Sequence, residues 1–153
     1  MVFPFDLIYK SAMQLLPAPM DSPAARNMLF AIAMQESRLI RRQQIMGPAR
    51  GFWQFEEGGG VHGVLNHGLT RPLIHKVLDA LQYDYAVHTS YVAIEHNDIL
   101  ACCYARLLLY TVPEPLPVRQ DAQEGWRQYL WAWRPGKPHP LTWDPFYEQA
   151  WTG

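Results

Sequence analysis

The sequence predicts an all-α protein, a compact helical domain with at most one short hairpin around residues 41–60. Apolar residues recur at intervals of three and four along most of the chain, which is the period of an amphipathic helix. Sustained alternation of apolar and polar residues, the signature of a half-buried strand, is absent. Hydrophobic residues make up 49% of the 153 residues, enough for a substantial core. We therefore expect residues 1–153 to form one domain.

The first two helices are expected in the N-terminal third. Apolar residues fall at helical spacing over residues 5–16, and Pro17 ends that segment. Ser22-Pro23 is typical of a helix start, because serine caps the first amides and proline fits the first helical position. We expect this second helix to run to about Leu39. Its apolar stripe consists of Ala25, Met28, Leu29, Ile32 and Ala33.

The middle of the chain combines a loop with two further helices. Residues 41–60 are expected to form a long loop or hairpin-like excursion, because Gly47-Pro48 and a run of three glycines punctuate it. A third helix is expected over residues 70–81. Asn97 is a candidate cap for a fourth, whose residues 99–110 are apolar nearly all round, so this helix belongs in the centre of the core.

Two last helices are expected after a proline-rich break at residues 113–117. Asp121, with Glu124 three residues later, resembles a capping box. The helix that follows should end at Arg134-Pro135-Gly136, since proline and glycine are poor continuations. A short final helix is expected to start at Asp144-Pro145.

Composition excludes several classes of partner and cofactor. The formal net charge is −1, so nothing electrostatic recruits nucleic acid or an anionic membrane. The first sixteen residues do not resemble a signal peptide, and apolar runs fall short of the roughly 18 residues of a membrane span. Cys102 and Cys103 are adjacent and are expected as small core residues, with a metal or redox pair as the alternative. The six histidines lack the spacing of a zinc site, so we expect no metal and no cofactor.

Glu36 is the most informative residue of the sequence. It lies on the apolar face of its helix, four residues after Ile32 and three after Ala33. Burial raises a carboxyl pKa, and a raised pKa suits a general acid that works near neutrality. The alternative is a structural ion pair. Its candidate partners are Arg38, Arg41, Arg42 and Arg50.

A second feature follows in the loop, where Gly51-Phe52-Trp53-Gln54-Phe55 joins a permissive glycine to aromatic rings and one amide. Sugar rings stack on flat apolar faces, and amides bond their hydroxyl and N-acetyl groups. The alternative is that the three rings are core aromatics around a turn.

Together the two features resemble the soluble lytic transglycosylases of the lysozyme superfamily, especially phage-encoded forms. That family has a catalytic Glu-Ser at a helix end and G-x-x-G-L-M-Q in a loop roughly fifteen residues later. Glu36-Ser37 matches the first part, and residues 47–54 resemble the second. Residues 97–108 and 132–136 are similar, more loosely, to two later family segments.

The resemblance implies a lysozyme-like fold and a role for each matching residue. Glu36 would be the sole catalytic acid and base, and Ser37 would orient its carboxylate. Gln54, with Phe52 beside it, would contact the N-acetyl sugar, while Gly51 would let the backbone approach the glycan. A second set of substrate contacts would come from Trp133 and Arg134, which stand where the family has tyrosine and asparagine.

The implied reaction is cleavage of the bond between N-acetylmuramic acid and N-acetylglucosamine, closing a 1,6-anhydro ring without water. The partners would be peptidoglycan strands and other phage virion proteins, with the chain in the virion or host cytoplasm and delivered to the wall. At a net charge of −1, the polyanionic wall polymer would be held by shape and hydrogen bonds.

Two alternatives remain open at this stage. One is a hydrolytic muramidase with a second carboxylate, for which Glu56 and Glu57 are the candidates. Against it stands the expectation that these two glutamates point to solvent or hold the loop, which leaves no carboxylate across the cleft from Glu36. The other alternative is a virion structural or adaptor protein that keeps the fold and has lost turnover.

Overall fold

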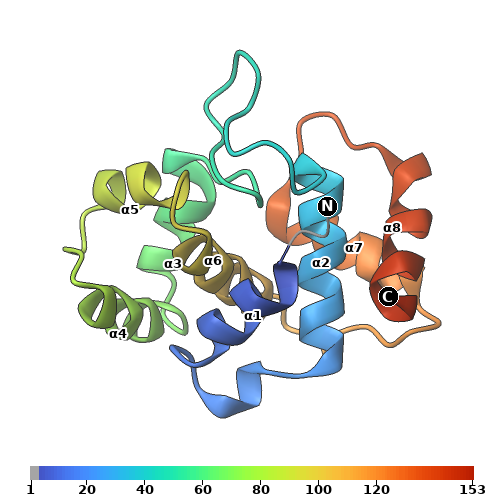
Figure 1. The fold of residues 1–153 in the computed structure, drawn as a ribbon, viewed down its shortest axis with the longest axis horizontal. Helices are drawn as coiled ribbons and strands as arrows, with labels where there is room; N and C mark the ends of the chain where they lie inside the picture. The colour runs from blue at the N-terminus through green and yellow to red at the C-terminus, as the bar shows by residue number, and fades with distance from the viewer. Residues whose placement is uncertain (1–3) are drawn as a thin grey trace.

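The computed structural model confirms the all-α prediction and describes residues 4–153 (Figure 1). Eight α-helices are present in these residues, joined by short turns and by one long excursion after α2. The α-helices are α1 (Phe5–Met13), α2 (Pro23–Ser37), α3 (His62–Asn66), α4 (Arg71–Leu81), α5 (Val87–Ile94), α6 (Asp98–Tyr110), α7 (Ala122–Trp133) and α8 (Pro140–Thr152). The short turns are η1 (Ala18–Met20) and η2 (Glu57–Val61).

Helix α6 forms the centre of the molecule, as its apolar circumference predicts. It contacts α1, α2, α3, α4, α5 and α7, and in Figure 1 it lies between the α3–α5 side and the α2–α7–α8 side. Cys102 and Cys103 are free thiols buried in this helix. Burial raises the pKa of the Cys103 thiol to about 12 and that of Cys102 well above its ordinary value. Both cysteines are therefore core residues here.

Side-chain caps start three of the helices at the predicted positions. Ser22 Oγ accepts a hydrogen bond from the Ala25 amide at the start of α2. Asn97 Oδ1 accepts from Leu100, and Asp121 Oδ1 accepts from Glu124. Each cap satisfies an amide that the helix leaves without a partner, a contribution of about 1 kcal/mol.

Several predicted boundaries need correction. Helix α2 ends at Ser37 rather than Leu39, because Arg38 and Leu39 adopt left-handed backbone angles, with φ of 59° and 56°. Helices α3 and α5 lie in segments where no helix was predicted. Helix α8 starts at Pro140, four residues before the expected Asp144, and Pro145 lies inside it. The helix continues through Pro145 because α8 packs along α2 and buries a face that includes Trp143 and Tyr147.

The excursion between α2 and η2 is the predicted hairpin-like segment. Two isolated antiparallel bridges hold it together, Gln43 with Arg50 and Arg50 with Phe55. The Arg50 amide donates to the Phe55 carbonyl, and the Phe55 amide donates back, both at 2.8 Å. The segment therefore folds back against the end of α2, which brings residues 54–56 close to Glu36.

Residues 4–153 contain neither a helix of the kind that spans a membrane nor a cluster of metal ligands. In that part of the chain, no helix combines the length and the apolar character that crossing a membrane would need. Within the same residues, no group of three or more His, Cys, Asp or Glu side chains is arranged to hold a metal ion.

Candidate active site

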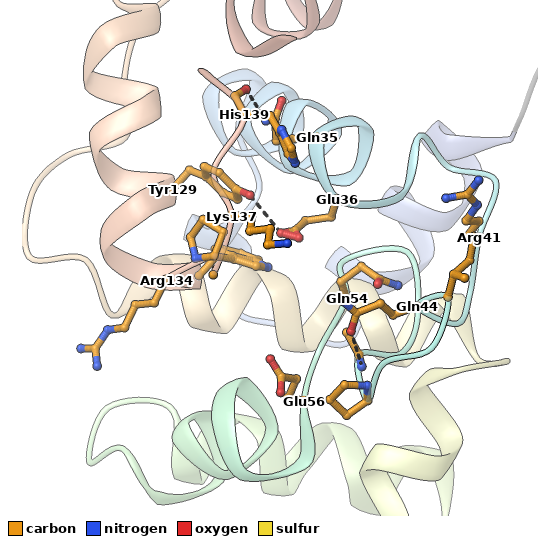
Figure 2. Close-up of a pocket in the computed structure, with 16 residues that line it drawn as sticks. Gln35, Glu36, Arg41, Gln44, Gln54, Glu56, Tyr129, Arg134, Lys137 and His139 are labelled. Carbon is orange, nitrogen blue, oxygen red and sulfur yellow. Dashed lines mark hydrogen bonds between the residues drawn. The ribbon is translucent and has the colours of Figure 1, made fainter. Parts of the chain in front are cut away.

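A cleft of about 570 Å³ contains Glu36 and is built from three segments distant in sequence (Figure 2). The end of α2 forms one wall, the 41–56 excursion forms the second, and the end of α7 with the α7–α8 connection forms the third. The cleft is mainly polar, and aromatic surface reaches it from Tyr129 and Trp133 on α7. Concave sites of this size with a few convergent polar groups are typical of ligand binding.

Glu36 lies in the last turn of α2 with its carboxyl group at the cleft. Tyr129 donates a hydrogen bond to Glu36 Oε1 at 2.9 Å. Burial is the main cause that raises the pKa of Glu36 to about 7. The hydrogen bond from Tyr129 lowers this pKa, and the negative charge of Glu56 contributes a smaller increase. A large fraction of Glu36 is therefore protonated near neutral pH, which is the state that a general acid needs.

The four arginines near Glu36 in sequence make other contacts. Arg42 pairs with Asp98 at 2.7 Å, and Arg50 pairs with Glu95 at 3.1 Å. The guanidinium of Arg38 lies 4.7 Å from the ring centre of Phe146, and Arg41 lines the cleft. None of the four arginines forms an ion pair with Glu36, so the structural ion pair that was the alternative to a general acid is not found here.

Tyr129 is a site residue that the sequence interpretation missed. Its ring is 2% exposed and stacks on Trp143 of α8, with ring centres 5.3 Å apart and planes 10° from parallel. Tyr129 lies among other aromatic and apolar residues of α7, so the sequence pattern does not set it apart. A usable signal was the phenol itself, because a buried tyrosine hydroxyl needs a hydrogen-bond partner.

Gln54 borders the same cleft as Glu36, as the sequence predicted. Its backbone is left-handed, with φ of 51°, and its side-chain Nε2 donates to the Gly51 carbonyl at 2.9 Å. This bond within the turn holds the amide at the cleft edge. An amide in this position can donate and accept hydrogen bonds with a ligand in the cleft.

Three residues that the resemblance assigned to the site make contacts within the fold, and these contacts account for their positions. Ser37 is buried and donates to the Ala33 carbonyl while accepting from the Leu39 amide, so its proton is not directed at Glu36. Phe52 is 1% exposed and packs under the guanidinium of Arg42, which leaves no ring face for a sugar.

Gly51 is the third of these residues. Its φ of +76° favours glycine, and a Cβ there would lie 2.8 Å from Ile94 Cγ2. The turn and the packing against α5 therefore explain this glycine without a glycan. The neighbouring rings of Trp53 and Phe55 are buried as well, so the core interpretation of these aromatics was correct.

Trp133 and Arg134 line the cleft where α7 ends. The indole N–H of Trp133 donates to the Trp53 carbonyl at 3.0 Å, so this side chain joins α7 to the excursion. Arg134 ends the helix in a left-handed conformation, with φ of 48°. Its side chain is exposed and in Figure 2 extends away from Glu36.

The two loop glutamates differ in position. Glu57 pairs with His88 at 2.9 Å, as expected of a residue that holds the loop. Glu56 lines the cleft, and in Figure 2 it lies across from Glu36 with its carboxylate toward the open space. Glu56 is exposed to solvent, as expected, but the expectation that no carboxylate lies across the cleft from Glu36 is wrong. Its position gives the site a second carboxylate.

Comparison of the chain with protein-family models, with curated proteins and with solved structures found no match.

Proposed function

We propose that the protein cleaves the glycan strands of peptidoglycan, with Glu36 as the general acid. The supporting observation is a carboxyl group with a pKa raised to about 7 at the wall of a cleft that also holds an amide and aromatic surface. In this proposal Glu36 gives its proton to the bridging oxygen between N-acetylmuramic acid and N-acetylglucosamine. The hydrogen bond from Tyr129 then stabilises the carboxylate that remains.

Glu36→Gln tests this role directly. The amide has nearly the same shape and cannot deliver a proton, so we expect lysis of purified cell walls to fall by about 10²–10⁴-fold. Glu57→Gln removes a nearby charge that belongs to the pair with His88, and this control should lyse walls like the unmodified protein. Unreduced clearing by Glu36→Gln, with circular dichroism showing the same fold, would exclude the proposal.

Two routes are open once the bond is protonated. In the lytic transglycosylase route, which the sequence resemblance implies, the muramic 6-hydroxyl closes onto the anomeric carbon and returns its proton to Glu36. In the hydrolytic route a second carboxylate activates water. Glu56, which lines the cleft across from Glu36, is the candidate base for the hydrolytic route.

Mass analysis of the released muropeptides distinguishes the two routes. Reducing muramic ends indicate hydrolysis, whereas 1,6-anhydromuramic ends, one water lighter, indicate the transglycosylase reaction. Glu56→Gln should slow the hydrolytic route by about 10²–10⁴-fold, because the base is lost. The same substitution should change the ring-closing route much less.

A third outcome separates the enzyme from a binding protein. If the unmodified chain and Glu36→Gln both leave walls intact and both bind glycan strands tightly, the chain is an adaptor that has kept the fold. Placement in a phage particle, which the resemblance implies, belongs to this proposal as well. It is tested by detecting the chain in purified virions.

A further inference from the structure

The cleft gathers cationic side chains that form no ion pair with any other residue in the range 4–153. Five arginines of residues 4–153 form ion pairs: Arg26, Arg42, Arg50, Arg119 and Arg127. Arg41, Arg134 and Lys137 line the cleft, are exposed, and make no ion pair within those residues. These three residues are called the cleft cations below.

The cleft cations come from both sides of Glu36. Arg41 follows α2, whereas Arg134 and Lys137 belong to the α7–α8 connection. Figure 2 shows Arg41 beyond Gln54 on one side of Glu36 and Arg134 on the opposite side. A strand that lay along this cleft would therefore meet positive charge on each side of the bond next to Glu36.

The charge of the cleft differs from that of the whole chain. The chain carries a formal net charge of −1. The carboxyl groups that line the cleft are Glu36, which is largely protonated below pH 7, and Glu56. Three cations against these two groups leave the cleft positive in that pH range. A cleft of one sign raises the local concentration of substrates of the opposite sign.

We propose that the cleft cations bind the carboxylates of the peptide stems attached to muramic acid. This inference rests on the proposed function and adds a substrate class, namely glycan strands that carry anionic stems. Guanidinium groups suit this task because they bind carboxylates with two parallel hydrogen bonds. The expectation that the wall polymer is held by shape and hydrogen bonds alone is thereby revised.

The test compares two substrates that differ in charge. One consists of soluble glycan strands with free stem carboxylates, and the other of the same strands after carbodiimide coupling with ammonia, which converts the carboxylates to primary amides. We expect kcat/KM to be about 10-fold higher for the anionic strands at low ionic strength and the difference to shrink in salt. Equal values for the two substrates would overturn the proposal.

Substitution assigns the preference to the named residues. In Arg41→Gln/Arg134→Gln/Lys137→Gln, the ratio of kcat/KM between anionic and amidated strands should fall by about 2-fold per charge removed, and so approach 1. The matched control removes three exposed cations outside the cleft, as Lys10→Gln/Arg71→Gln/Lys76→Gln. An equal fall in the control would attribute the effect to net charge and overturn the assignment.

Equilibrium binding separates this inference from the proposed function. Glu36→Gln should bind anionic strands more tightly than amidated strands, whether or not the unmodified protein cleaves either one. Inactivity towards both substrates with the binding preference intact would overturn the proposed reaction alone. Cleavage of both with no difference in binding would overturn the stem recognition alone.

Discussion

At Glu36, the requirements of folding and of acid chemistry oppose each other. The same burial that raises the pKa to about 7 makes the ionised carboxylate costly in the folded chain. Below pH 4.5, its ordinary value, the group is protonated in both the folded and the unfolded chain, so it costs nothing. Above about pH 7 the folded chain must hold the charge, and the cost is complete.

Glu36→Gln should therefore stabilise the protein at alkaline pH. We expect the free energy of unfolding at pH 8 to rise by up to about 3 kcal/mol, and to change little at pH 4. Urea denaturation at the two pH values measures the difference. Glu57→Gln serves as the control, since Glu57 pairs with His88 outside the cleft. A pH-independent effect of Glu36→Gln would contradict the assigned pKa.

Tyr129 controls the pH range of the same group. In Tyr129→Phe the hydrogen bond that lowers the pKa of Glu36 is lost, so that pKa should rise by about one unit. Because the acid must be protonated to act, the alkaline limb of kcat/KM should move to higher pH. Tyr147→Phe is the matched control, because the Tyr147 hydroxyl donates to the Val118 carbonyl. An unmoved alkaline limb in Tyr129→Phe would refute the coupling.

Among the helices, the sequence predicted the starts that a capping side chain determines, and it missed or misplaced the helices whose position depends on packing. The cap residues fixed the starts of α2, α6 and α7, since a side-chain oxygen bonds an amide only three residues away. Helices α3 and α5 have five and eight residues, too few for a clear apolar period. The start of α8 was misplaced because Pro140 and Pro145 both suit a first turn, and contact with α2 decides between them.

Some residues of the candidate site could also be predicted from the sequence, whereas others depend on how the chain folds. Glu36 and Gln54 could be predicted, because a carboxylate on an apolar stripe and an amide beside a glycine turn are visible in the chain. The partner of Glu36 could not, since Tyr129 is 93 residues away and reaches it only when α7 packs into place. Glu56 enters the cleft because two bridges fold the excursion back, which no pattern in the loop specifies.

The start of α6 offers a test at this scale. Asn97 caps the helix through Oδ1, and its Nδ2 donates to the Tyr83 hydroxyl at 3.2 Å. Asn97→Ala removes both contacts and should lower the free energy of unfolding by about 1–2 kcal/mol. Asn97→Asp keeps the capping oxygen and should recover most of that loss. Equal destabilisation by the two substitutions in urea would show that the cap contributes little.

For the whole molecule, the cleft lies where separately formed parts meet. Residues 35–56 supply one part of its lining and residues 129–139 supply the rest. The hydrogen bond from Trp133 to the Trp53 carbonyl and that from Tyr129 to Glu36 both cross this junction. The acid therefore acquires its raised pKa only when the C-terminal helices have packed onto the first half of the chain.

The buried thiols of α6 make the rate at which the core opens measurable, because a thiol reagent reaches them only in opened molecules. A thiol reacts with iodoacetamide only as an accessible thiolate, and both cysteines are held from water with raised pKa values. Labelling in native buffer should therefore proceed only through molecules whose central helix has come free, and should accelerate with urea. Labelling as fast as in the unfolded chain would place α6 outside the stable core. Otherwise the mass shift over time reports how often the molecule opens, without any engineered probe.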